Sequence, residues 1–393
     1  MKSRNALWVI LVLGLTIGWM SGTVWAEPIK IGACMPITGP FSFAGKHINQ
    51  GLADYITYAN EQGGVNGQKI EYIFEDTGYD TKRAIASFKK IIAQHNPQIM
   101  YGESTGLAKA MSEEITERYK VLYGGCTFSD ELSDRSKHPY IFISGPTYAQ
   151  MFGVLLEYIA ENPKHKGKKP TVAFFYADSA FGRDPIPYAR EKAKALGIEV
   201  VAEEVTKSGA IDVTSQILDL KRNNPDYCIF QGYVVPPMPD VIRGARDYGL
   251  DTTFMGTFWS MSKMLLDKLG PDGDGFMGVC PFAYWYDDVP MIQEMKAFHK
   301  KHHPGVDYRP IYYTQAWFTG MIYVKALKML AEKGLPLTGE NLKDMIPRIQ
   351  DWDTGGLAGK VSFRSTNATA MGRVYKAQGG KFLPVSDWIY LEK

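Results

Sequence analysis

The chain has 393 residues, of which 45% are hydrophobic and 22% are charged, a composition ordinary for a soluble globular protein. This length predicts about two domains, because single hydrophobic cores stop growing near ~250–300 residues. Removing the two basic residues of the first segment from the 44 in the chain leaves 42 basic against 42 acidic side chains. This balance excludes the strong positive charge typical of proteins that bind nucleic acid or anionic membranes.

Residues 1–26 have the layout of a secretory signal peptide. Lys2 and Arg4 give a positive start, residues 6–20 are mostly apolar, and Val24-Trp25-Ala26 offers a small–x–small cleavage site. The apolar run is short for a membrane-spanning helix. We therefore expect the protein to be exported to the periplasm without this segment.

The chain has four cysteines, Cys34, Cys126, Cys228 and Cys280. Ile31-Gly32-Ala33-Cys34 looks like a lipidation box, but the charged residues Glu27 and Lys30 separate it from the apolar run. Export permits disulfides. All four cysteines, however, lie in short apolar runs, where an unpaired thiol behaves as a small buried hydrophobic group. We predict four reduced thiols, no lipid anchor and no zinc site.

Apolar strands alternate with amphipathic helices along the chain. The first part predicts strands at 29–35, 70–75, 98–101 and 121–124, with helices at 49–62, 81–94 and 107–119. The pattern restarts with helices at 148–161, 187–196, 213–222 and 239–248 and strands at 171–176, 199–204, 227–231, 254–255 and 278–282. A long helix at 313–332 and two short strands at 359–363 and 372–378 follow. This order predicts an α/β fold with two lobes, each built on a parallel sheet.

Residues that directly follow the strands are candidates for a binding site, because ligands of open α/β sheets bind beyond the carboxyl ends of the strands. Gly102-Glu103-Ser104-Thr105-Gly106 follows the third strand and leads into a helix, and Gly124-Gly125-Cys126-Thr127 follows the fourth. Hydroxyl groups and amides at a helix N-terminus favour an anion. Simple capping of the helix by Ser104 or Thr105 is the alternative interpretation.

Aromatic residues stand at several other strand ends. They are Phe41 and Phe43 after the first strand, and Phe181, Tyr233, Phe258 and Trp259 in the second part. The turn at 38–45 lacks the spacing of a phosphate-binding loop. Ordinary core packing is the alternative for these rings, but their recurrence at corresponding strand ends favours a binding wall.

The stretch GESTG also fits G-x-S-x-G, which would make Ser104 the nucleophile of a secreted serine hydrolase. Such an enzyme also needs a histidine and an oxyanion loop. The downstream histidines lie in lysine-rich or proline-flanked segments typical of exposed chain, and no HGGG-like stretch occurs. His299 and His303 are spaced i, i+4, but the lysines between them favour a solvated helix face over a metal site. We expect no catalysis, no metal and no cofactor.

Taken together, these residues resemble the periplasmic substrate-binding proteins of ABC transporters, in the branched-chain amino acid group. The resemblance covers essentially the whole mature chain and rests on IGACMPITGPFSFAG, GGVNG with its following acidic segment, GESTG, GGCTFSDEL, YADSAFG and GLAGKVSF. It implies a type I periplasmic binding protein fold, in which two lobes joined by three crossovers close on a ligand. The implied lobes are 27–147 plus 281–366 and 148–280 plus 367–393. Also implied are a membrane permease and an ATPase as partners, and we expect a monomer.

By the same resemblance, Ser104, Thr105, Gly125 and Thr127 would hold a carboxylate of the ligand, and Phe181 stands where many members have a tyrosine. Amino acid binders usually have an acidic residue after the strand near 254, where this chain reads GTFWS. A buried ammonium without an acidic partner is costly.

We therefore expect an aromatic or other hydrophobic carboxylic acid, packed against Phe43, Phe181, Tyr233, Phe258 and Trp259. Branched-chain amino acid binding is the alternative, with Asp178 or Glu103 supplying the missing acid.

Overall fold

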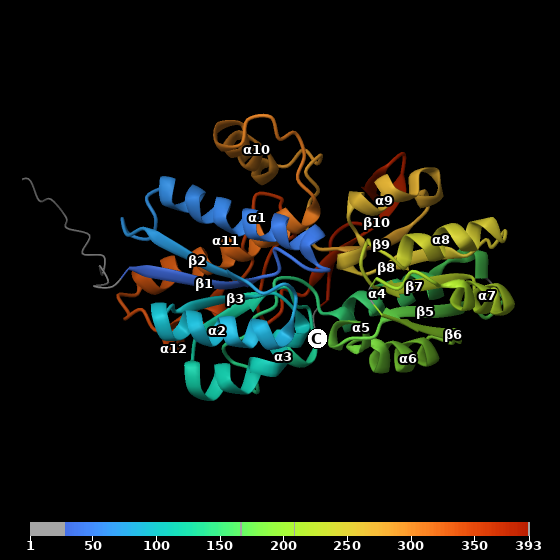
Figure 1. The fold of residues 1–393 in the computed structure, drawn as a ribbon, viewed down its shortest axis with the longest axis horizontal. Helices are drawn as coiled ribbons and strands as arrows, with labels where there is room; N and C mark the ends of the chain where they lie inside the picture. Colours follow the sequence, from blue (N-terminus) through green and yellow to red (C-terminus); the bar gives the residue numbers. More distant parts are fainter. Residues whose placement is uncertain (1–27, 166, 208, 392–393) are drawn as a thin grey trace, which may run out of the picture.

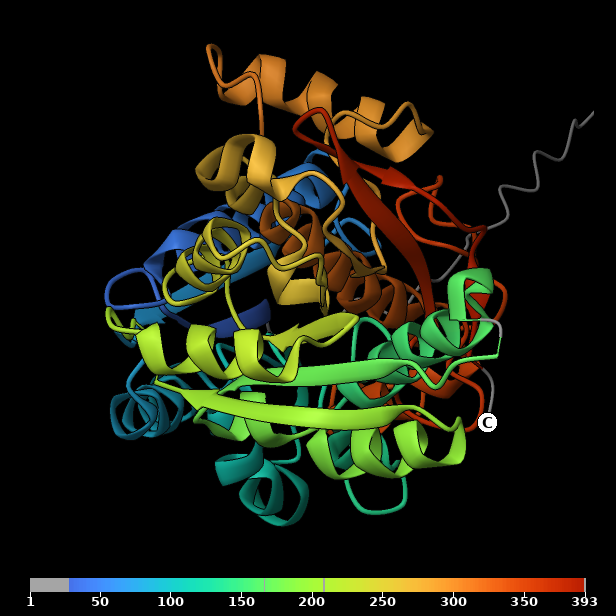
Figure 2. The ribbon, with the colours of Figure 1, turned by 90° about the vertical axis from the view of Figure 1, so that its right-hand side faces the viewer.

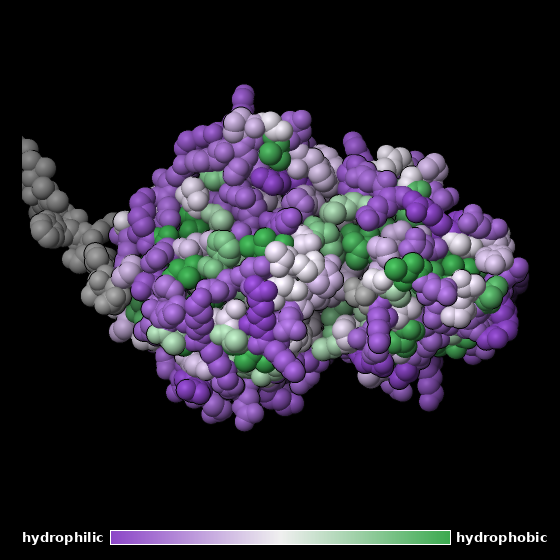
Figure 3. All heavy atoms as spheres, in the orientation of Figure 1, coloured by the Kyte–Doolittle hydropathy of each residue, from purple (hydrophilic) through white to green (hydrophobic). Residues whose placement is uncertain are grey.

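Two α/β lobes lie side by side in the computed structural model, which describes residues 28–391 with the exception of 166 and 208 (Figure 1). The predicted signal peptide therefore lies outside the described residues. Hydrophilic side chains dominate the visible face, and a constriction separates the two halves (Figure 3). None of the helices in the described part combines the length and the apolar character needed to span a bilayer.

The first lobe is built on a four-stranded parallel sheet with the order β2-β1-β3-β4. Its strands are β1 (Ile29–Met35), β2 (Ile70–Asp76), β3 (Ile99–Gly102) and β4 (Leu122–Gly125), and its first helices are α1 (Ser42–Glu61), α2 (Thr81–His95) and α3 (Thr105–Glu114). Figure 1 places α1 on one face of the sheet and α2 and α3 on the other. β1 is central and almost wholly buried, which explains its continuous apolar run.

The second lobe contains a larger sheet with the order β11-β10-β9-β8-β7-β5-β6. Its strands are β5 (Thr171–Ala177), β6 (Glu199–Thr206), β7 (Tyr227–Gln231), β8 (Thr253–Gly256), β9 (Met277–Cys280), β10 (Met371–Gln378) and β11 (Lys381–Pro384), with β12 (Ile389–Tyr390) beside β10. Strands β5 to β9 are parallel, whereas β10 runs antiparallel to β9 and β11. The helices are α4 (Tyr148–Glu161), α5 (Ala180–Arg183), α6 (Ile186–Ala195), α7 (Thr214–Asn223), α8 (Met238–Asp247) and α9 (Lys263–Leu269). Figure 2 views this lobe end-on, with helices above and below the strands.

The chain crosses between the lobes three times. It passes from β4 to the second lobe, returns after β9 to form α10 (Pro290–His302), α11 (Ile311–Glu332) and α12 (Gly339–Lys343), and then crosses again to β10 (Figure 1). Helix α11 packs tightly on α1, since a Cβ atom at Gly51 would lie 2.4 Å from the carbonyl oxygen of Tyr313. The predicted two-lobe α/β fold is confirmed, and the residue boundaries of the lobes stay a prediction.

Two predicted elements differ from the structure. The first helix begins at Ser42 and not near residue 49, because the glycine-rich start looked like a loop. Gly45 is needed there, since a Cβ atom would lie 2.0 Å from the carbonyl oxygen of Pro36. The predicted strand at 359–363 is reduced to an isolated bridge between Trp352 and Val361.

The four cysteines are all free and buried, which confirms the prediction of reduced thiols. Cys34 lies inside β1, where its thiol points to the carbonyl oxygen of Ala84 at 3.6 Å. Burial raises the pKa of this thiol far above its ordinary value. Cys34 is therefore an unreactive core residue.

Candidate functional site

A small, tightly packed cavity lies where the two lobes meet. It is lined by Phe41, Tyr79, Glu103, Thr105, Cys126, Tyr148, Phe181, Tyr233 and Trp259. Most of these residues come from segments that directly follow strands of the two sheets, as expected for open α/β sheets. These side chains nearly fill the cavity and leave almost no space accessible to a water-sized molecule.

The polar side of the cavity is formed by hydroxyl groups at the start of α3. Ser104 is the N-cap of this helix and accepts a hydrogen bond from the amide of Leu107 at 3.1 Å. The hydroxyl groups of Thr105 and Thr127 lie 3.0 Å apart, and both residues are buried. The positive end of the helix dipole lies beside them, so this corner favours a negatively charged group.

Gly125 allows the backbone of the first lobe to close up around these hydroxyl groups. Its φ of 138° is a conformation that other residues rarely adopt, and a Cβ atom would lie 2.3 Å from the carbonyl oxygen of Gly102. A glycine is thus required at position 125, the last residue of β4, by the close approach of β3 and β4.

The apolar side of the cavity is formed largely by rings of the second lobe. Phe181 stacks on Tyr233 with 4.8 Å between ring centroids and 12° between ring planes. The indole nitrogen of Trp259 donates a hydrogen bond to the hydroxyl oxygen of Tyr148 at 2.9 Å. These rings offer a flat apolar surface with fixed orientations.

Rings of the first lobe meet those of the second across the cavity. Phe41 stacks on Tyr79 at 4.7 Å, and the hydroxyl oxygens of Tyr79 and Tyr233 are 2.6 Å apart. Because Tyr79 follows β2 and Tyr233 follows β7, this hydrogen bond joins the two lobes directly. The structure is therefore that of a closed cleft.

Glu103 is a buried acid in the wall of the cavity, only 1% exposed. The hydroxyl group of Thr77 donates a hydrogen bond to its Oε2, whereas Oε1 has no partner among the described residues. Burial, reinforced by the carboxylates of Asp76 and Asp80 and opposed by Arg83, raises the pKa of Glu103 to about 8. Glu103 is therefore mainly uncharged at neutral pH.

The structure brings most of the predicted site residues together. Thr105, Phe181, Tyr233 and Trp259 line the cavity, and Ser104, Gly125 and Thr127 lie directly beside it. Phe43 and Phe258 form a second layer, with Phe43 against Phe41 at 5.1 Å and Phe258 against Trp259 at 4.9 Å. Their roles toward a ligand stay predictions.

Three residues that line the cavity were not predicted as site residues from the sequence. Tyr79 follows β2, and the rule used for the other strands would have found it. Cys126 was assigned only to the core. Tyr148 opens α4 after a crossover, so only the spatial structure brings it to the cleft.

Two sequence hypotheses place other groups at this site. Asp178 was a candidate partner for a ligand ammonium, but it is exposed and pairs with Arg183 at 2.8 Å. The hydrolase hypothesis needs a histidine beside Ser104. No histidine lines the cavity in the described part of the chain, and the Ser104 hydroxyl caps α3.

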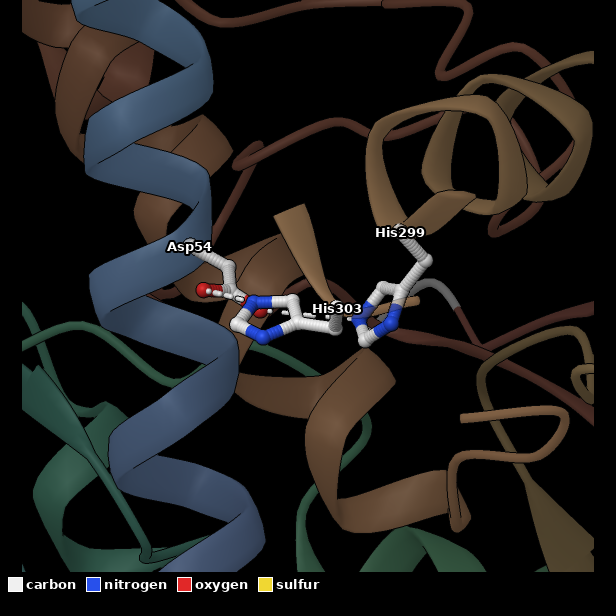
Figure 4. Close-up of side chains that lie close together, drawn as sticks. All are labelled: Asp54, His299 and His303. Atoms are coloured by element: carbon white, nitrogen blue, oxygen red, sulfur yellow. Dashed lines mark hydrogen bonds and ion pairs between the residues drawn. The ribbon is translucent and has the colours of Figure 1, made fainter. Parts of the chain in front are cut away.

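A second cluster of polar side chains joins α1 to α10 and to the chain just beyond α10. Figure 4 shows Asp54 on α1 facing His299 and His303. The Nε2 atom of His303 lies 2.9 Å from Asp54 Oδ1, and that of His299 lies 3.5 Å from Oδ2. The prediction that His299 is exposed is wrong, since this side chain is 2% exposed.

The chemistry of this cluster favours a structural role over metal binding. Asp54 also accepts hydrogen bonds from Gln50 at 2.7 Å and Tyr313 at 2.9 Å, so both oxygens are engaged. The guanidinium of Arg309 donates to His299 Nε2 at 3.3 Å and places a positive charge where a cation would bind. Burial would raise the pKa of Asp54, but its hydrogen bonds hold it below the ordinary value. Asp54 is therefore an ionised carboxylate. We call Asp54 and the side chains that contact it, Gln50, His299, His303 and Tyr313, the Asp54 clamp.

Two curated proteins illustrate the sequence relationships of the chain. A leucine-, isoleucine-, valine-, threonine- and alanine-binding protein of Pseudomonas aeruginosa is 26% identical over 283 residues, which cover 71% of this chain and 74% of that protein. A Leu/Ile/Val-binding protein homolog of Brucella abortus is 28% identical over 211 residues. That second match spans only about half of either protein, 52% of each.

Solved structures of similar proteins share the fold. A branched-chain amino acid ABC transporter protein from Thermus thermophilus with bound valine gives a TM-score of 0.85 at 24% identity, covering 93% of this chain and 97% of that one. A fatty acid ABC transporter substrate-binding protein from Thermomonospora curvata gives 0.77 at 22% identity, covering 94% of both. At these identities the likeness concerns the fold alone.

The family profile of periplasmic binding proteins matches residues 28–381, which include the first sheet, strands β5 to β10 of the second sheet and every residue that lines the cavity. Proteins of this kind are non-catalytic, so the serine hydrolase hypothesis is wrong. The two lobes, the cavity between them and this match together lead to one conclusion: the chain belongs to the periplasmic binding protein family and is homologous to the Leu/Ile/Val-binding substrate-binding proteins of ABC transporters.

Proposed function

We propose that this protein is an exported receptor that captures a small hydrophobic carboxylic acid between its lobes and delivers it to the permease and ATPase of an ABC importer. The carboxylate would lie against Ser104, Thr105 and Thr127 at the start of α3, with Gly125 closing the backbone around it. The apolar body would lie against the rings of Phe181, Tyr233 and Trp259. Hinge closure would then exclude water from the ligand.

The observation that carries this proposal is the charge of the cavity wall. An anion is favoured at one end by hydroxyl groups and a helix N-terminus, whereas most of the rest of the wall is aromatic. Glu103 is the one acidic residue that lines the cavity in the described part of the chain, and it is mainly uncharged at neutral pH. A ligand ammonium would therefore lack an ionised partner, and this favours an acid without an amino group.

Branched-chain amino acid binding is the second candidate function. It is supported by the amino acids that the Pseudomonas aeruginosa relative is named for binding and by the valine bound in the Thermus thermophilus structure. A fatty acid binder with the same fold supports the first candidate, since its ligand is an acid without an ammonium group.

Matched ligand pairs separate the two candidates in a thermal-shift experiment. 4-Methylpentanoate is leucine without its ammonium group, and 3-phenylpropionate bears the same relation to phenylalanine. A ligand present at 100 times its Kd stabilises the folded protein by about 2.7 kcal/mol, which gives a clear rise in Tm. We expect the acids, together with benzoate, to raise Tm more than leucine, isoleucine, valine and phenylalanine.

Stabilisation by the amino acids alone would contradict the proposed ligand class and favour the second candidate. Stabilisation by neither member of each pair would contradict both candidates. Export is tested separately, by sequencing the N-terminus of the protein from the periplasm, where cleavage after Ala26 is expected.

A further inference from the structure

Glu103 combines three properties that no other acidic residue among the described residues shares. It lines the cavity, it is 1% exposed, and one of its carboxyl oxygens has no hydrogen-bond partner in the described part of the chain. It also directly precedes Ser104, the N-cap of α3. Its carboxyl group therefore stands beside the place where the proposed function puts the carboxylate of the ligand.

The groups around Glu103 do not supply a counter-charge for it. Asp76 and Asp80 add negative charge, and Arg83 is the one cation among the charged groups that act on it. The guanidinium of Arg83 is largely exposed and lies 3.8 Å from Asp76. The other titratable neighbours are Cys34, Tyr79, Tyr123 and Cys126, and burial raises the pKa of each and keeps it neutral.

Two carboxylates that share one buried site cannot both ionise without strong repulsion. An acid bound at Ser104 and Thr127 is therefore compatible with Glu103 only while Glu103 holds its proton. A zwitterionic amino acid imposes the opposite requirement, because its ammonium needs Glu103 to lose that proton.

We propose that Glu103 is the specificity-determining residue of the cleft, and that its uncharged form admits carboxylic acids without an ammonium group, which bind together with one proton on Glu103. This inference rests on the proposed function and adds to it the reason why the cleft would distinguish ligands by their charge. It makes the affinity for an acid depend on pH in a direction opposite to that for an amino acid.

Isothermal titration calorimetry with 4-methylpentanoate and leucine tests this coupling between pH 6 and pH 9.5. Each titration is done in two buffers of different ionisation enthalpy, which gives the number of protons exchanged. We expect the Kd of the acid to be constant up to about pH 7.5. Above pH 8 it should rise about tenfold per pH unit, because each binding event then takes up nearly one proton.

Two variants assign the effect to Glu103. Glu103→Gln keeps the shape of an uncharged carboxyl group, so it should bind the acid within about threefold of the wild type at pH 7 and lose the pH dependence. Glu204→Gln is the matched control, since Glu204 on β6 also has a raised pKa, about 7, but does not line the cavity. It should keep the pH dependence of the wild type.

Binding of the acid with a Kd that stays constant up to pH 9.5 would overturn the inference and leave the proposed function intact. Leucine binding at least tenfold tighter than the acid, with proton release and a tenfold or larger loss of affinity in Glu103→Gln, would overturn the inference and favour the second candidate function. Binding of neither probe would contradict the proposed function. In that case, infrared spectroscopy of the free protein still tests whether Glu103 is protonated. The carbonyl band of its neutral carboxyl group should be present at pH 7 in the wild type and missing in Glu103→Gln. A wild-type spectrum without that band would overturn the inference.

Discussion

Asp54 and Glu103 are both buried acidic residues of the first lobe, yet their environments leave them with opposite charge states. Asp54 accepts hydrogen bonds from Gln50 and Tyr313 and lies against two histidines, whereas Glu103 accepts one from Thr77 and keeps an oxygen without a partner. The pKa of Asp54 is accordingly lowered, and that of Glu103 is raised.

The comparison teaches that hydrogen-bond donors, more than burial itself, decide whether a buried carboxyl group is ionised. A fully satisfied carboxylate stabilises the fold and has nothing left to offer a ligand. A partly satisfied carboxyl group is a cost to the fold, and it retains an atom that a ligand can engage.

The largest expected effect comes from breaking the Asp54 clamp. Asp54→Ala removes a buried carboxylate that accepts hydrogen bonds from Gln50 and Tyr313 and pairs with His303, so we expect a loss of about 3 kcal/mol in the free energy of unfolding. Urea denaturation followed by tryptophan fluorescence measures it. Glu61→Gln is the control, since Glu61 pairs with Lys301 and His302 at the exposed edge of the same helices and should change stability little. Equal losses in both variants would show that the clamp has no special role.

Glu103→Gln should change the free energy of unfolding in the opposite direction, toward higher stability. The pKa of Glu103 is raised in the folded protein, so its contribution to stability is fully present below the unfolded pKa of about 4.3 and is lost as pH rises through about 8. A neutral glutamine escapes this loss, and we expect the variant to be more stable than the wild type by about 2 kcal/mol at pH 8.5. Unfolding curves at pH 5 and pH 8.5 measure the difference, and an advantage that does not grow with pH would refute the assignment.

Thr127→Val tests the polar corner with a side chain of nearly the same shape. Removal of one hydrogen bond to a charged group costs about 1.5–3 kcal/mol, so we expect the Kd of the bound acid to rise about 10- to 100-fold. The Thr105 hydroxyl loses its neighbour at the same time. Ser136→Ala is a control on an exposed turn of the same lobe and should leave Kd unchanged. An unchanged Kd in Thr127→Val would place the carboxylate elsewhere.

Tyr79→Phe should have the smallest effect. It deletes the hydrogen bond between Tyr79 and Tyr233 but keeps the stacking on Phe41, so about 1 kcal/mol of closure energy is lost. Small-angle scattering should show a larger radius of gyration without ligand, and the Kd should rise several-fold. A variant that is as compact as the wild type would mean that this contact does not hold the lobes together.

Much of the fold follows from the sequence because alternation of apolar strands and amphipathic helices reflects local physics. The long helix α11 was predicted from residue 313 and begins at Ile311. The segment at 359–363 was mispredicted because a short apolar run does not reveal whether a partner strand lies beside it, and Val361 finds only Trp352.

The site was predicted in part, for a similar reason. Strand ends are marked in the sequence, so Thr105, Phe181 and Tyr233 were found by a general rule. The charge state of Glu103 was not, because it depends on which donors reach the carboxyl group. His299 was misjudged in the same way, since neighbouring lysines gave no sign that Asp54 lies opposite.

The tight contact between α1 and α11 has a practical consequence. Gly51 and Gly320 let the two helices approach until backbone and ring atoms touch, so the pair has no room to slide. A fluorophore attached to the outer surface of α1 therefore moves with the whole first lobe. Paired with a second fluorophore on α7, it should report rotation of one lobe against the other, and the protein becomes a scaffold for an optical sensor of its ligand.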